Sequence, residues 1–273
     1  MSRSAHFAAI IIGAALLAPN AAFADVSISA AGSTALQPLV QAAAEAYQSQ
    51  HADVKISVTG GGSRTGLTLA NSKAVDLGDS DILAAKDQTD LVDHRVAAVG
   101  FSVVVHPETG VKSLSKKQIQ DIFSGKVTNW KDVGGKDQTI TVINRPASSG
   151  TRAVFLITLM DKTELSKDSL VEDATGTVVQ KVSQTPGAVS YASFSGTHGK
   201  AGILELAVDG IAATEANVES GKYPFWSYEH MYTNGPPNKD VSRFIAFLSS
   251  NGALLQKLGY IAVRDIQKPE NDR

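Results

Sequence analysis

The chain has 273 residues, carries 25 Lys and Arg against 27 Asp and Glu, and contains no cysteine. The net charge of −2 argues against a nucleic-acid or anionic-membrane binder, because both partners select a basic face. The lack of cysteine excludes disulfides, thiolate metal sites, cysteine nucleophiles and the cysteine that carries a lipid anchor.

The first 24 residues are typical of a secretory signal peptide. Arg3 and His6 give a weakly positive start, residues 7–18 form an apolar run, and AFA at residues 22–24 is an A-x-A cleavage site. The apolar run is too short to span a bilayer. A buried N-terminal helix is the alternative. We expect residues 1–24 to be removed, leaving an exported, soluble protein without a lipid anchor.

Strands and helices alternate along the rest of the sequence. This pattern favours a mainly parallel sheet covered by helices, with ligands at the carboxyl ends of the strands. In chain order the spacing of apolar residues predicts a strand at 26–29, a helix at 36–47, a strand at 54–59, a helix at 66–72, strands at 75–78 and 95–107, a helix at 115–123, a strand at 139–144, helices at 151–160 and 175–183, a strand at 188–192, a helix at 241–258 and a strand at 260–263.

Two segments are interpreted as crossings between two domains. The apolar run VAAVGFSVVV within residues 95–107 is long, and we expect one strand that leaves one domain and enters the other. The aromatic segment YPFWSYEHMYT at residues 223–233 is interpreted as the return crossing. An ordinary core strand is the alternative for this second segment.

Three turns rich in Gly, Ser and Thr follow predicted strands and precede predicted helices: AAGSTALQPL (30–39), TGGGSRTGL (59–67) and NRPASSGTR (144–152). Such turns direct backbone N–H groups and hydroxyl groups at an anion, at the positive end of a helix dipole. Residues 61–68 nearly match a P-loop, but Leu67 replaces the essential lysine, so a nucleoside triphosphate site is not expected. Simple helix capping is the alternative for each turn taken alone.

The third turn and a nearby acidic turn define the expected chemistry. Arg145 is suited to a bidentate pair with two oxyanion oxygens. Asp79 and Asp81, in GDSD, place carboxylates near this anion site, which is favourable only if the ligand still carries a proton that Asp81 accepts. Phosphate keeps such a proton at neutral pH and sulfate does not. We interpret Asp79 as a turn residue.

These segments, with IFSGKVTNW at residues 122–130 and KLGYIAV at 257–263, resemble the short form of the phosphate-binding proteins of phosphate-specific ABC importers. The resemblance covers nearly all of the chain after residue 24. It implies an α/β, two-lobed type II periplasmic-binding fold, with a mostly parallel sheet flanked by helices in each lobe and the ligand in the interlobe cleft. It places the signal peptide at 1–24, one lobe at 25–103 plus 226–273, and the other at 104–225.

The resemblance also implies the site and the partners. Phosphate is expected to be held without metal or cofactor, and to be passed to the membrane permease of an ABC importer by a periplasmic monomer that binds no nucleic acid. The family often has an acidic residue at the position of Ala147, where an acid would pair with Arg145. The implied phosphate ligands are Ser33, Thr34, Ala35, Ser63, Asp81, Arg145, Ser149, Gly150 and Thr151.

Two other functions remain open from the sequence. One is a binding protein for another tetrahedral oxyanion on the same scaffold. The other is an exported phosphatase or serine hydrolase, against which stand the lack of a G-x-S-x-G motif and the lack of metal-ligand spacing among the histidines. We therefore expect a binding protein and not an enzyme.

Overall fold

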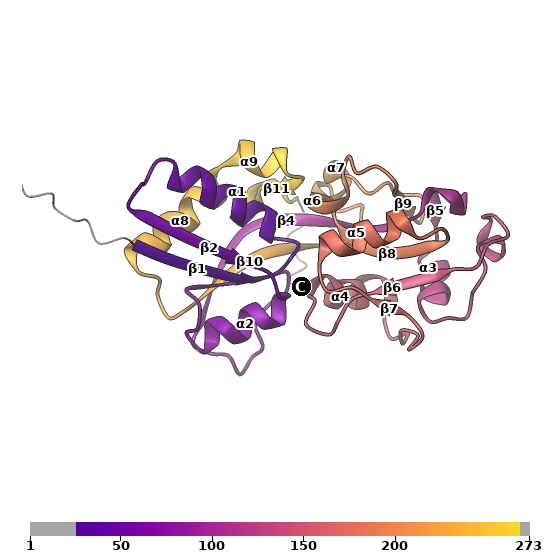
Figure 1. The fold of residues 1–273 in the computed structure, drawn as a ribbon, viewed down its shortest axis with the longest axis horizontal. Helices are drawn as coiled ribbons and strands as arrows, with labels where there is room; N and C mark the ends of the chain where they lie inside the picture. Colours follow the sequence, from indigo (N-terminus) through magenta and orange to yellow (C-terminus); the bar gives the residue numbers. More distant parts are fainter. Residues whose placement is uncertain (1–25, 268–273) are drawn as a thin grey trace, which may run out of the picture.

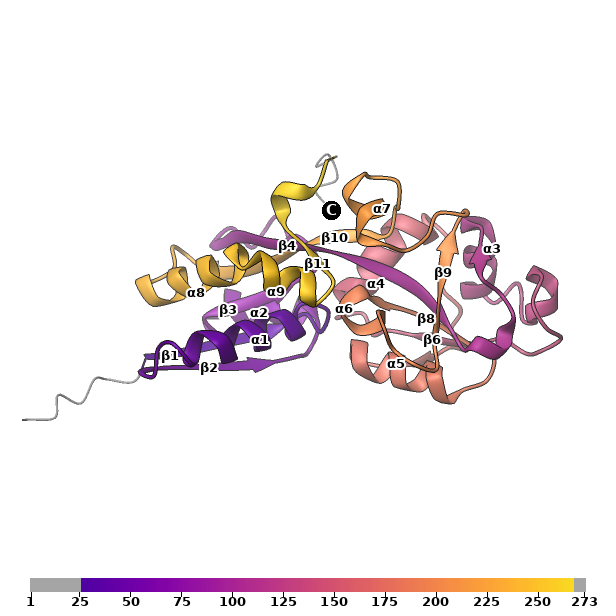
Figure 2. The same ribbon diagram turned by 90° about the horizontal axis from the view of Figure 1, so that it is seen from above.

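One long strand, β4 (Leu91–Val105), takes part in both halves of the protein, which the computed structural model describes over residues 26–267 (Figures 1 and 2). From Leu91 to Gly100 it pairs antiparallel with β10 (Trp226–Asn234). From Phe101 to Val105 it pairs antiparallel with β8 (Ala188–Ser193), and its last three residues also pair with β9 (Leu204–Val208). The apolar run predicted to be one strand is therefore one strand.

Lobe I, on the left in Figure 1, is built on the parallel strands that open the chain. β1 pairs parallel with both β2 and β3, and β3 pairs antiparallel with β10. Helices α1 and α8 contact each other over this sheet, whereas α2 packs on β1 and β3. The elements of lobe I, besides parts of β4 and β10, are β1 (Val26–Gly32), α1 (Gln37–Gln48), β2 (Val54–Thr59), α2 (Ser63–Asn71), β3 (Leu77–Ser80), α8 (Lys239–Ser250), α9 (Gly252–Lys257), β11 (Tyr260–Ile261) and η4 (Val263–Asp265).

Lobe II, on the right in Figure 1, repeats this plan. β6 pairs parallel with β7 and β8, and β5 pairs parallel with β9. Its elements, besides the end of β4 and strands β8 and β9, are η1 (Pro107–Thr109), β5 (Ser113–Leu114), α3 (Lys116–Phe123), η2 (Trp130–Val133), β6 (Thr141–Asn144), α4 (Gly150–Phe155), the π-helical η3 (Leu156–Met160), β7 (Leu170–Val171), α5 (Thr175–Gln184), α6 (Phe194–Thr197) and α7 (Glu215–Glu219).

Every antiparallel pairing among the named strands of residues 26–267 involves β4 or β10, and the other pairings are parallel. The predicted α/β, two-lobed architecture with parallel strands flanked by helices is confirmed. Parallel strands present their carboxyl ends at one edge, where loops bind ligands. Thr34, which follows β1, contacts Arg145, which follows β6, so these edges of the two lobes face each other.

The core runs through both lobes. Its largest cluster of buried side chains joins residues of β1, α1 and α8 to residues of α3, α4 and β8. In lobe II the rings of Phe155 and Tyr191 stack with centroids 4.1 Å apart, and Phe123 lies 4.7 Å from Phe155. Beside the crossing strands, Phe101 lies 5.1 Å from Phe225. Of these contacts, the one between Phe101 and Phe225 lies where the chain crosses between the lobes.

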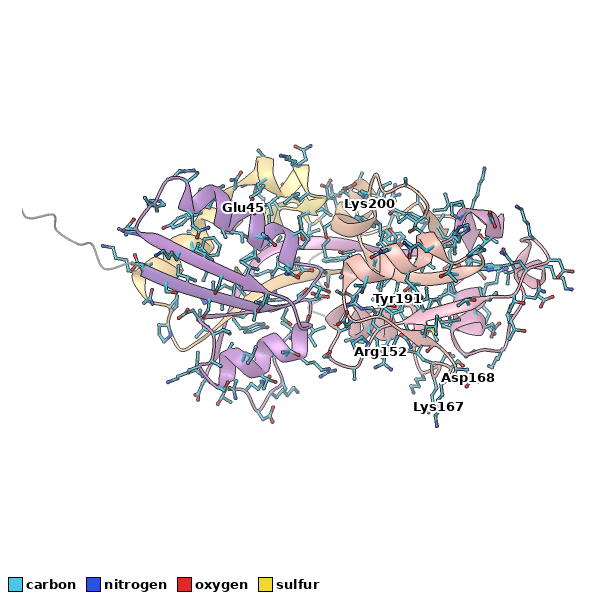
Figure 3. All side chains as sticks on the ribbon, in the orientation of Figure 1. Glu45, Arg152, Lys167, Asp168, Tyr191 and Lys200 are labelled. Atoms are coloured by element: carbon cyan, nitrogen blue, oxygen red, sulfur yellow. The ribbon has the colours of Figure 1, made fainter. Side chains whose placement is uncertain are left out.

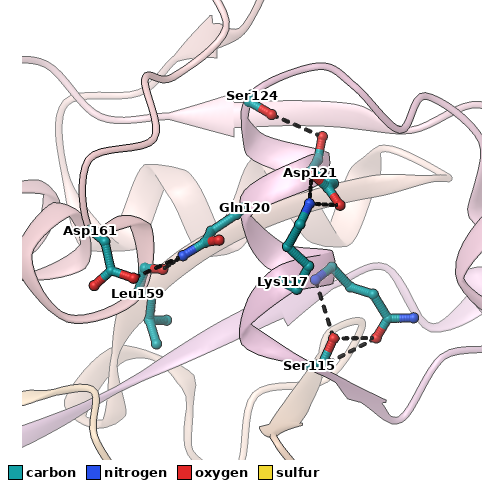
Figure 4. A network of polar contacts seen from close by, with 8 residues as sticks. Ser115, Lys117, Gln120, Asp121, Ser124, Leu159 and Asp161 are labelled. Carbon is teal, nitrogen blue, oxygen red and sulfur yellow. Dashed lines mark hydrogen bonds and ion pairs between the residues drawn. The ribbon is translucent and has the colours of Figure 1, made fainter.

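Local polar contacts explain where α3 begins and how it is tied to its neighbour (Figure 4). The Ser115 hydroxyl accepts a hydrogen bond from the Gln118 amide at 3.2 Å, and the Gln118 side chain accepts one from the Ser115 amide at 2.8 Å, forming a capping box. On the exposed face Lys117 pairs with Asp121 one turn on. Gln120 donates to the Leu159 carbonyl at 2.9 Å, which ties α3 to the π-helical turn η3.

Several predicted elements differ in the structure, and three of the differences have a clear local cause or consequence. The helix expected at 241–258 is two helices, because Asn251 leaves the helical conformation and its side chain accepts the Leu254 amide at 3.2 Å, capping α9. The helix expected at 151–160 changes from α to π geometry at Leu156. β3 runs to Ser80, so Asp79 lies inside a buried strand. The interpretation of Asp79 as a turn residue is therefore wrong.

Between residues 26 and 267, the structure has no helix long and apolar enough to cross a bilayer. The predicted signal peptide, residues 1–24, lies outside the described residues.

The crossing strand β4 makes a close contact that gives a stability test. A Cβ atom on Gly100 would lie 2.1 Å from a ring atom of Phe194, whose side chain is fully buried. We expect Gly100→Ala to lower the free energy of unfolding by about 1–3 kcal/mol, as overpacking in a core does. Urea unfolding measures the loss. In Gly176→Ala, where a Cβ atom meets no neighbour within 4 Å, stability should stay level or rise. Equal stability of Gly100→Ala and the parent would contradict this packing.

Candidate functional site

The nine predicted site residues are all buried and come from both lobes; all but Asp81 lie in strand-to-helix turns or at the first residues of the helices that follow them. The turn after β1 places Ser33, Thr34 and Ala35, and the start of α2 places Ser63. Asp81 follows β3 directly. From lobe II, the turn after β6 supplies Arg145, and the start of α4 supplies the rest, which are Ser149, Gly150 and Thr151.

Asp81 is the centre of this group. One carboxylate oxygen accepts a hydrogen bond from the Ser33 hydroxyl of lobe I, and the other accepts one from the Thr151 hydroxyl of lobe II at 2.9 Å. The Asp81 amide donates to the Ser63 hydroxyl at 2.9 Å. A single carboxyl group, 1% exposed, thus joins three of the predicted hydroxyl residues and connects the two lobes.

The first turn serves as a cap as well as a source of donors. The Ser33 hydroxyl accepts hydrogen bonds from the amides of Ala35 at 3.0 Å and Leu36 at 3.1 Å. Ser33 therefore both caps the turn before α1 and donates a hydrogen bond to Asp81 at the site. The Ala35 amide, predicted to contact a ligand, is bonded to Ser33 in this structure.

Arg145 supplies the positive charge. Its guanidinium is 2% exposed, and its Nη2 atom donates to the Thr34 hydroxyl at 3.1 Å and to the Asp173 carbonyl at 2.9 Å. Its Nε and Nη1 atoms have no hydrogen-bond partner within residues 26–267. Burial lowers the pKa of Arg145, while Tyr191, Asp81 and Asp173 act in the opposite direction. A buried cation with two unpaired donor nitrogens fits an anionic ligand with several oxygens.

The remaining contacts bring the backbones of the two lobes close together. A Cβ atom on Gly150 would lie 2.1 Å from the Ser63 hydroxyl oxygen, so only glycine fits at this point. The Arg64 amide donates to the Ser148 carbonyl at 3.1 Å, and its side chain donates to the Ala147 carbonyl at 3.1 Å. Arg64 therefore holds the lobes together at the edge of the site.

Three further hydrogen bonds complete the lobe II side of the site. The Ser149 hydroxyl accepts the Arg152 amide at 3.2 Å and so caps α4. Figure 3 labels Arg152 and Tyr191 in this region; the Tyr191 hydroxyl donates to the Asn144 side chain at 2.6 Å, just before Arg145. Thr175, at the start of α5, donates its amide to the Thr34 hydroxyl at 3.2 Å. The sequence ATGT at residues 174–177 was the available signal for this contact, and it was missed.

Two further carboxyl groups lie behind Asp81 and were not predicted as part of the site. Asp79 is 1% exposed, Glu229 of β10 is fully buried, and neither has a hydrogen-bond donor for its oxygens within residues 26–267. Burial raises the pKa of Asp79 to about 8, and the neighbouring Asp81 adds to the rise. Burial raises the pKa of Glu229 well above its usual value, with further contributions from Asp81 and Asp79.

The same environment acts differently on Asp81. Burial raises its pKa, but the hydroxyl groups of Ser33 and Thr151 and the charge of Arg145 counteract the rise. Of the three acids, Asp81 alone has donors that favour its charged form. The residues described by the structure contain no group of three His, Cys, Asp or Glu side chains arranged to hold a metal ion. The site is therefore one carboxylate, one guanidinium and a ring of hydroxyl and amide groups.

Comparison with known proteins gives consistent matches over most of the chain. Residues 18–251 match the family model described as a PBP superfamily domain. The phosphate-binding protein PstS of Bacillus subtilis is 42% identical over 252 residues, which cover 89% of this chain and 83% of that protein.

Solved structures give the same picture. A protein from Clostridium perfringens, described as a phosphate ABC transporter substrate-binding protein with bound phosphate, superposes with a TM-score of 0.82 at 30% identity, covering 87% of this chain and 99% of that one. An ABC-type phosphate transport receptor from Vibrio cholerae gives a TM-score of 0.70 at 27% identity, covering 86% and 99% of the two chains.

The buried acid Asp79 predicts a pH dependence of stability. The folded protein keeps the Asp79 proton up to a pKa of about 8, whereas the unfolded chain releases it near the ordinary value of 3.8. Between these values the folded state binds the extra proton, so its stability falls as pH rises, by about 1.4 kcal/mol per pH unit. Asp79→Asn removes this proton uptake.

Urea unfolding of both proteins at several pH values measures the effect. The stability of Asp79→Asn relative to the parent should increase as pH rises through this window. Glu45→Gln, on the exposed face of α1 (labelled in Figure 3), should follow the parent at each pH. If the free energies of unfolding of Asp79→Asn and the parent differed by the same amount at every pH between about 4 and about 8, Asp79 would be ionised in the folded state.

Proposed function

The chain belongs to the PstS family of phosphate-binding proteins within the PBP superfamily, and we propose that it captures inorganic phosphate between its two lobes and delivers it to an ABC importer. In this proposal it acts outside the cytoplasmic membrane as an exported, soluble monomer with no lipid anchor. Its partner is the membrane permease of the importer. It catalyses no reaction and needs no cofactor.

The observation that carries this function is a buried Asp81 and a buried Arg145 that influence each other electrostatically and lie among hydroxyl groups of both lobes. Arg145 offers two unpaired donor nitrogens to anionic oxygens. The Asp81 carboxylate can accept a hydrogen bond only from a ligand oxygen that carries a proton, so it favours such a ligand. Phosphate has both features at neutral pH, namely several anionic oxygens and at least one P–OH group. The proposed ligands are the nine residues that the structure gathers: Ser33, Thr34, Ala35, Ser63, Asp81, Arg145, Ser149, Gly150 and Thr151.

The lobes are proposed to close around the ion. We place one lobe at residues 25–103 plus 226–273 and the other at 104–225. Support comes from β4, which changes partner from β10 to β8 between Gly100 and Phe101, and from β10, which begins at Trp226. Closure would remove the ion from water and replace its hydration shell with fixed donors.

The hydrolase alternative gains no support from the site's hydroxyl groups. The hydroxyls of Ser33 and Thr151 donate to Asp81, and that of Ser149 caps α4. Each therefore has a binding or capping role, and none of these bonds pairs a serine with an imidazole base. We expect no turnover of p-nitrophenyl phosphate with or without divalent metal ions.

Titration calorimetry with phosphate, arsenate, sulfate and molybdate tests the proposed function. Phosphate and arsenate should bind with a dissociation constant in the micromolar range or below, since a ligand of about five heavy atoms gains roughly −1.5 kcal/mol per atom. Sulfate at millimolar concentration should not compete. Failure of the folded protein to bind phosphate would overturn the proposal, and preferential binding of molybdate or sulfate would favour another oxyanion.

Arg145→Ala should weaken phosphate binding by more than about 2 kcal/mol, or roughly 30-fold, because it removes a charge-assisted pair from a buried anion. The fold should be kept, as judged by circular dichroism. Arg243→Ala is the matched control, because Arg243 lies on the exposed face of α8 and pairs only at 3.6 Å with Asp240. Phosphate binding by Arg145→Ala within threefold of the parent would refute the assigned role.

Asp81→Asn should admit sulfate. A carboxylate next to a fully ionised anion is repelled and unpaired, whereas an amide can donate a hydrogen bond to an unprotonated oxygen. We expect the variant to gain measurable sulfate binding while it keeps some phosphate binding, as read from sulfate competition against bound phosphate.

The control for this experiment is Asp76→Asn. Asp76 accepts hydrogen bonds from the Ser29 amide and hydroxyl, both at 2.8 Å, on the exposed side of the sheet. This variant should discriminate as the parent does. The assignment of Asp81 fails if Asp76→Asn admits sulfate equally, or if the parent already binds it.

A further inference from the structure

A cluster of three carboxyl groups lies at the edge of the anion site, and only one of them has been assigned a role. Asp79 and Asp81 come from β3 and the residue after it, and Glu229 comes from the neighbouring strand β10. The two strands pair antiparallel, with Met231 opposite Asp79 and His230 opposite Ser80, so Glu229 lies at the level of Asp81. The oxygens of Glu229 have no hydrogen-bond partner within residues 26–267, and its pKa is raised by burial and by the charges of Asp81 and Asp79.

Two fully buried carboxyl groups on neighbouring strand positions are not both ionised, because each disfavours the charge of the other, so the pair holds a proton. The surrounding donors decide where the proton lies. Asp81 receives the Ser33 and Thr151 hydroxyls and faces Arg145. The oxygens of Glu229 and Asp79 receive no donor from residues 26–267. Charge is therefore favoured on Asp81, and the other two acids are neutral.

We propose that Asp79 and Glu229 are positioning residues that each keep a proton behind the phosphate site, and that the protonated Glu229 donates a hydrogen bond to the Asp81 carboxylate. This inference rests on the proposed function. The Glu229 O–H group fixes the side of Asp81 that faces away from the ligand. The lone pairs left on Asp81 then point to Ser33, to Thr151 and to the proton of the phosphate.

The charge of the site explains why the two protons matter. With both acids neutral, Arg145 and Asp81 nearly cancel, and an incoming anion meets hydroxyl and amide donors. Loss of either proton adds a buried negative charge beside the ligand, and phosphate is then repelled at short range in a site of low dielectric. Phosphate capture thereby depends on protons that neither contact the ligand nor leave with it.

The charged and titratable groups that face the pair come from several elements. They are Asp81 after β3, Arg145 after β6, and Tyr260 of β11, whose hydroxyl donates to the Ala35 carbonyl. On β10 the next residue, His230, bonds through Nδ1 to Asp93 at 2.7 Å. Of these groups, only the guanidinium of Arg145 carries a fixed positive charge, and its charge is directed at Asp81.

The direction of the effect follows from linkage. Asp79 begins to lose its proton as pH passes its pKa of about 8 in the ligand-free protein. Bound phosphate, being negative, favours the protonated acid, so binding at higher pH requires proton uptake. Each proton taken up weakens the apparent affinity by up to about tenfold per pH unit above this pKa. The ionisation of phosphate itself affects all variants equally, so it cancels when the dissociation constants of two variants at the same pH are divided.

The experiment compares phosphate dissociation constants of the parent, Asp79→Asn, Glu229→Gln and Glu229→Ala between about pH 6 and about pH 10. The dissociation constant of the parent divided by that of Asp79→Asn should rise at least tenfold over the alkaline part of this range, because the amide cannot ionise. Glu229→Ala should bind phosphate more than tenfold weaker at neutral pH. Glu229→Gln, which still donates a hydrogen bond to Asp81, should restore most of that loss. Glu45→Gln should follow the parent at every pH.

The outcomes separate this inference from the function on which it rests. If the parent binds no phosphate at any pH, the proposed function fails. A second outcome is that the parent binds phosphate while its dissociation constant, divided by that of Asp79→Asn and by that of Glu229→Gln, does not change with pH in either case. That result would refute the proposal that Asp79 and Glu229 hold protons. If Glu229→Ala does not fold, the pH dependence of the dissociation constants of Asp79→Asn and Glu229→Gln relative to the parent still tests the proposal. Equal binding by Glu229→Ala and Glu229→Gln would refute the positioning role.

Discussion

A buried carboxylate shared by two lobes is the interaction on which the site depends. Asp81 costs free energy to bury, and the hydroxyls of Ser33 and Thr151, one from each lobe, offset part of that cost. When the lobes separate, Asp81 loses Thr151 and Arg145 loses Thr34. The polar groups proposed to bind the ligand are therefore the same groups that connect the two lobes in this structure.

The carboxyl ends of the parallel strands bring the polar residues of the site together. β1 and β3 end in lobe I, β6 ends in lobe II, and each delivers a short polar turn to the interface. Helix α2 begins at the turn after β2 and α4 at the turn after β6, so their N-terminal amides and dipoles add to the attraction for an anion. Gly150 permits the close approach, since any side chain there would meet Ser63.

Much of the site was predictable because its residues are local to their turns. Ser33, Ser63 and Ser149 each stand at a strand-to-helix junction with a sequence signature, and periodicity placed those junctions within a few residues. Glu229 was not predictable in this way, because it is brought to Asp81 by pairing of β10 with β3, which no local pattern encodes. Asp79 was misassigned because a four-residue strand leaves little periodicity to define its end. The break at Asn251 did have a local signal in Asn-Gly, which the apolar stripe on either side concealed.

The shared strand β4 also determines how the protein deforms. Its ladder continues from one sheet into the other without a flexible loop, and the Phe101 amide is held by the Phe225 carbonyl at 2.9 Å where the partner strands change. A connection of this kind bends and twists as an elastic ribbon and does not swivel freely. If the lobes open and close as proposed, we expect this continuous ladder to restrict the motion to bending about the point where the partner strands change.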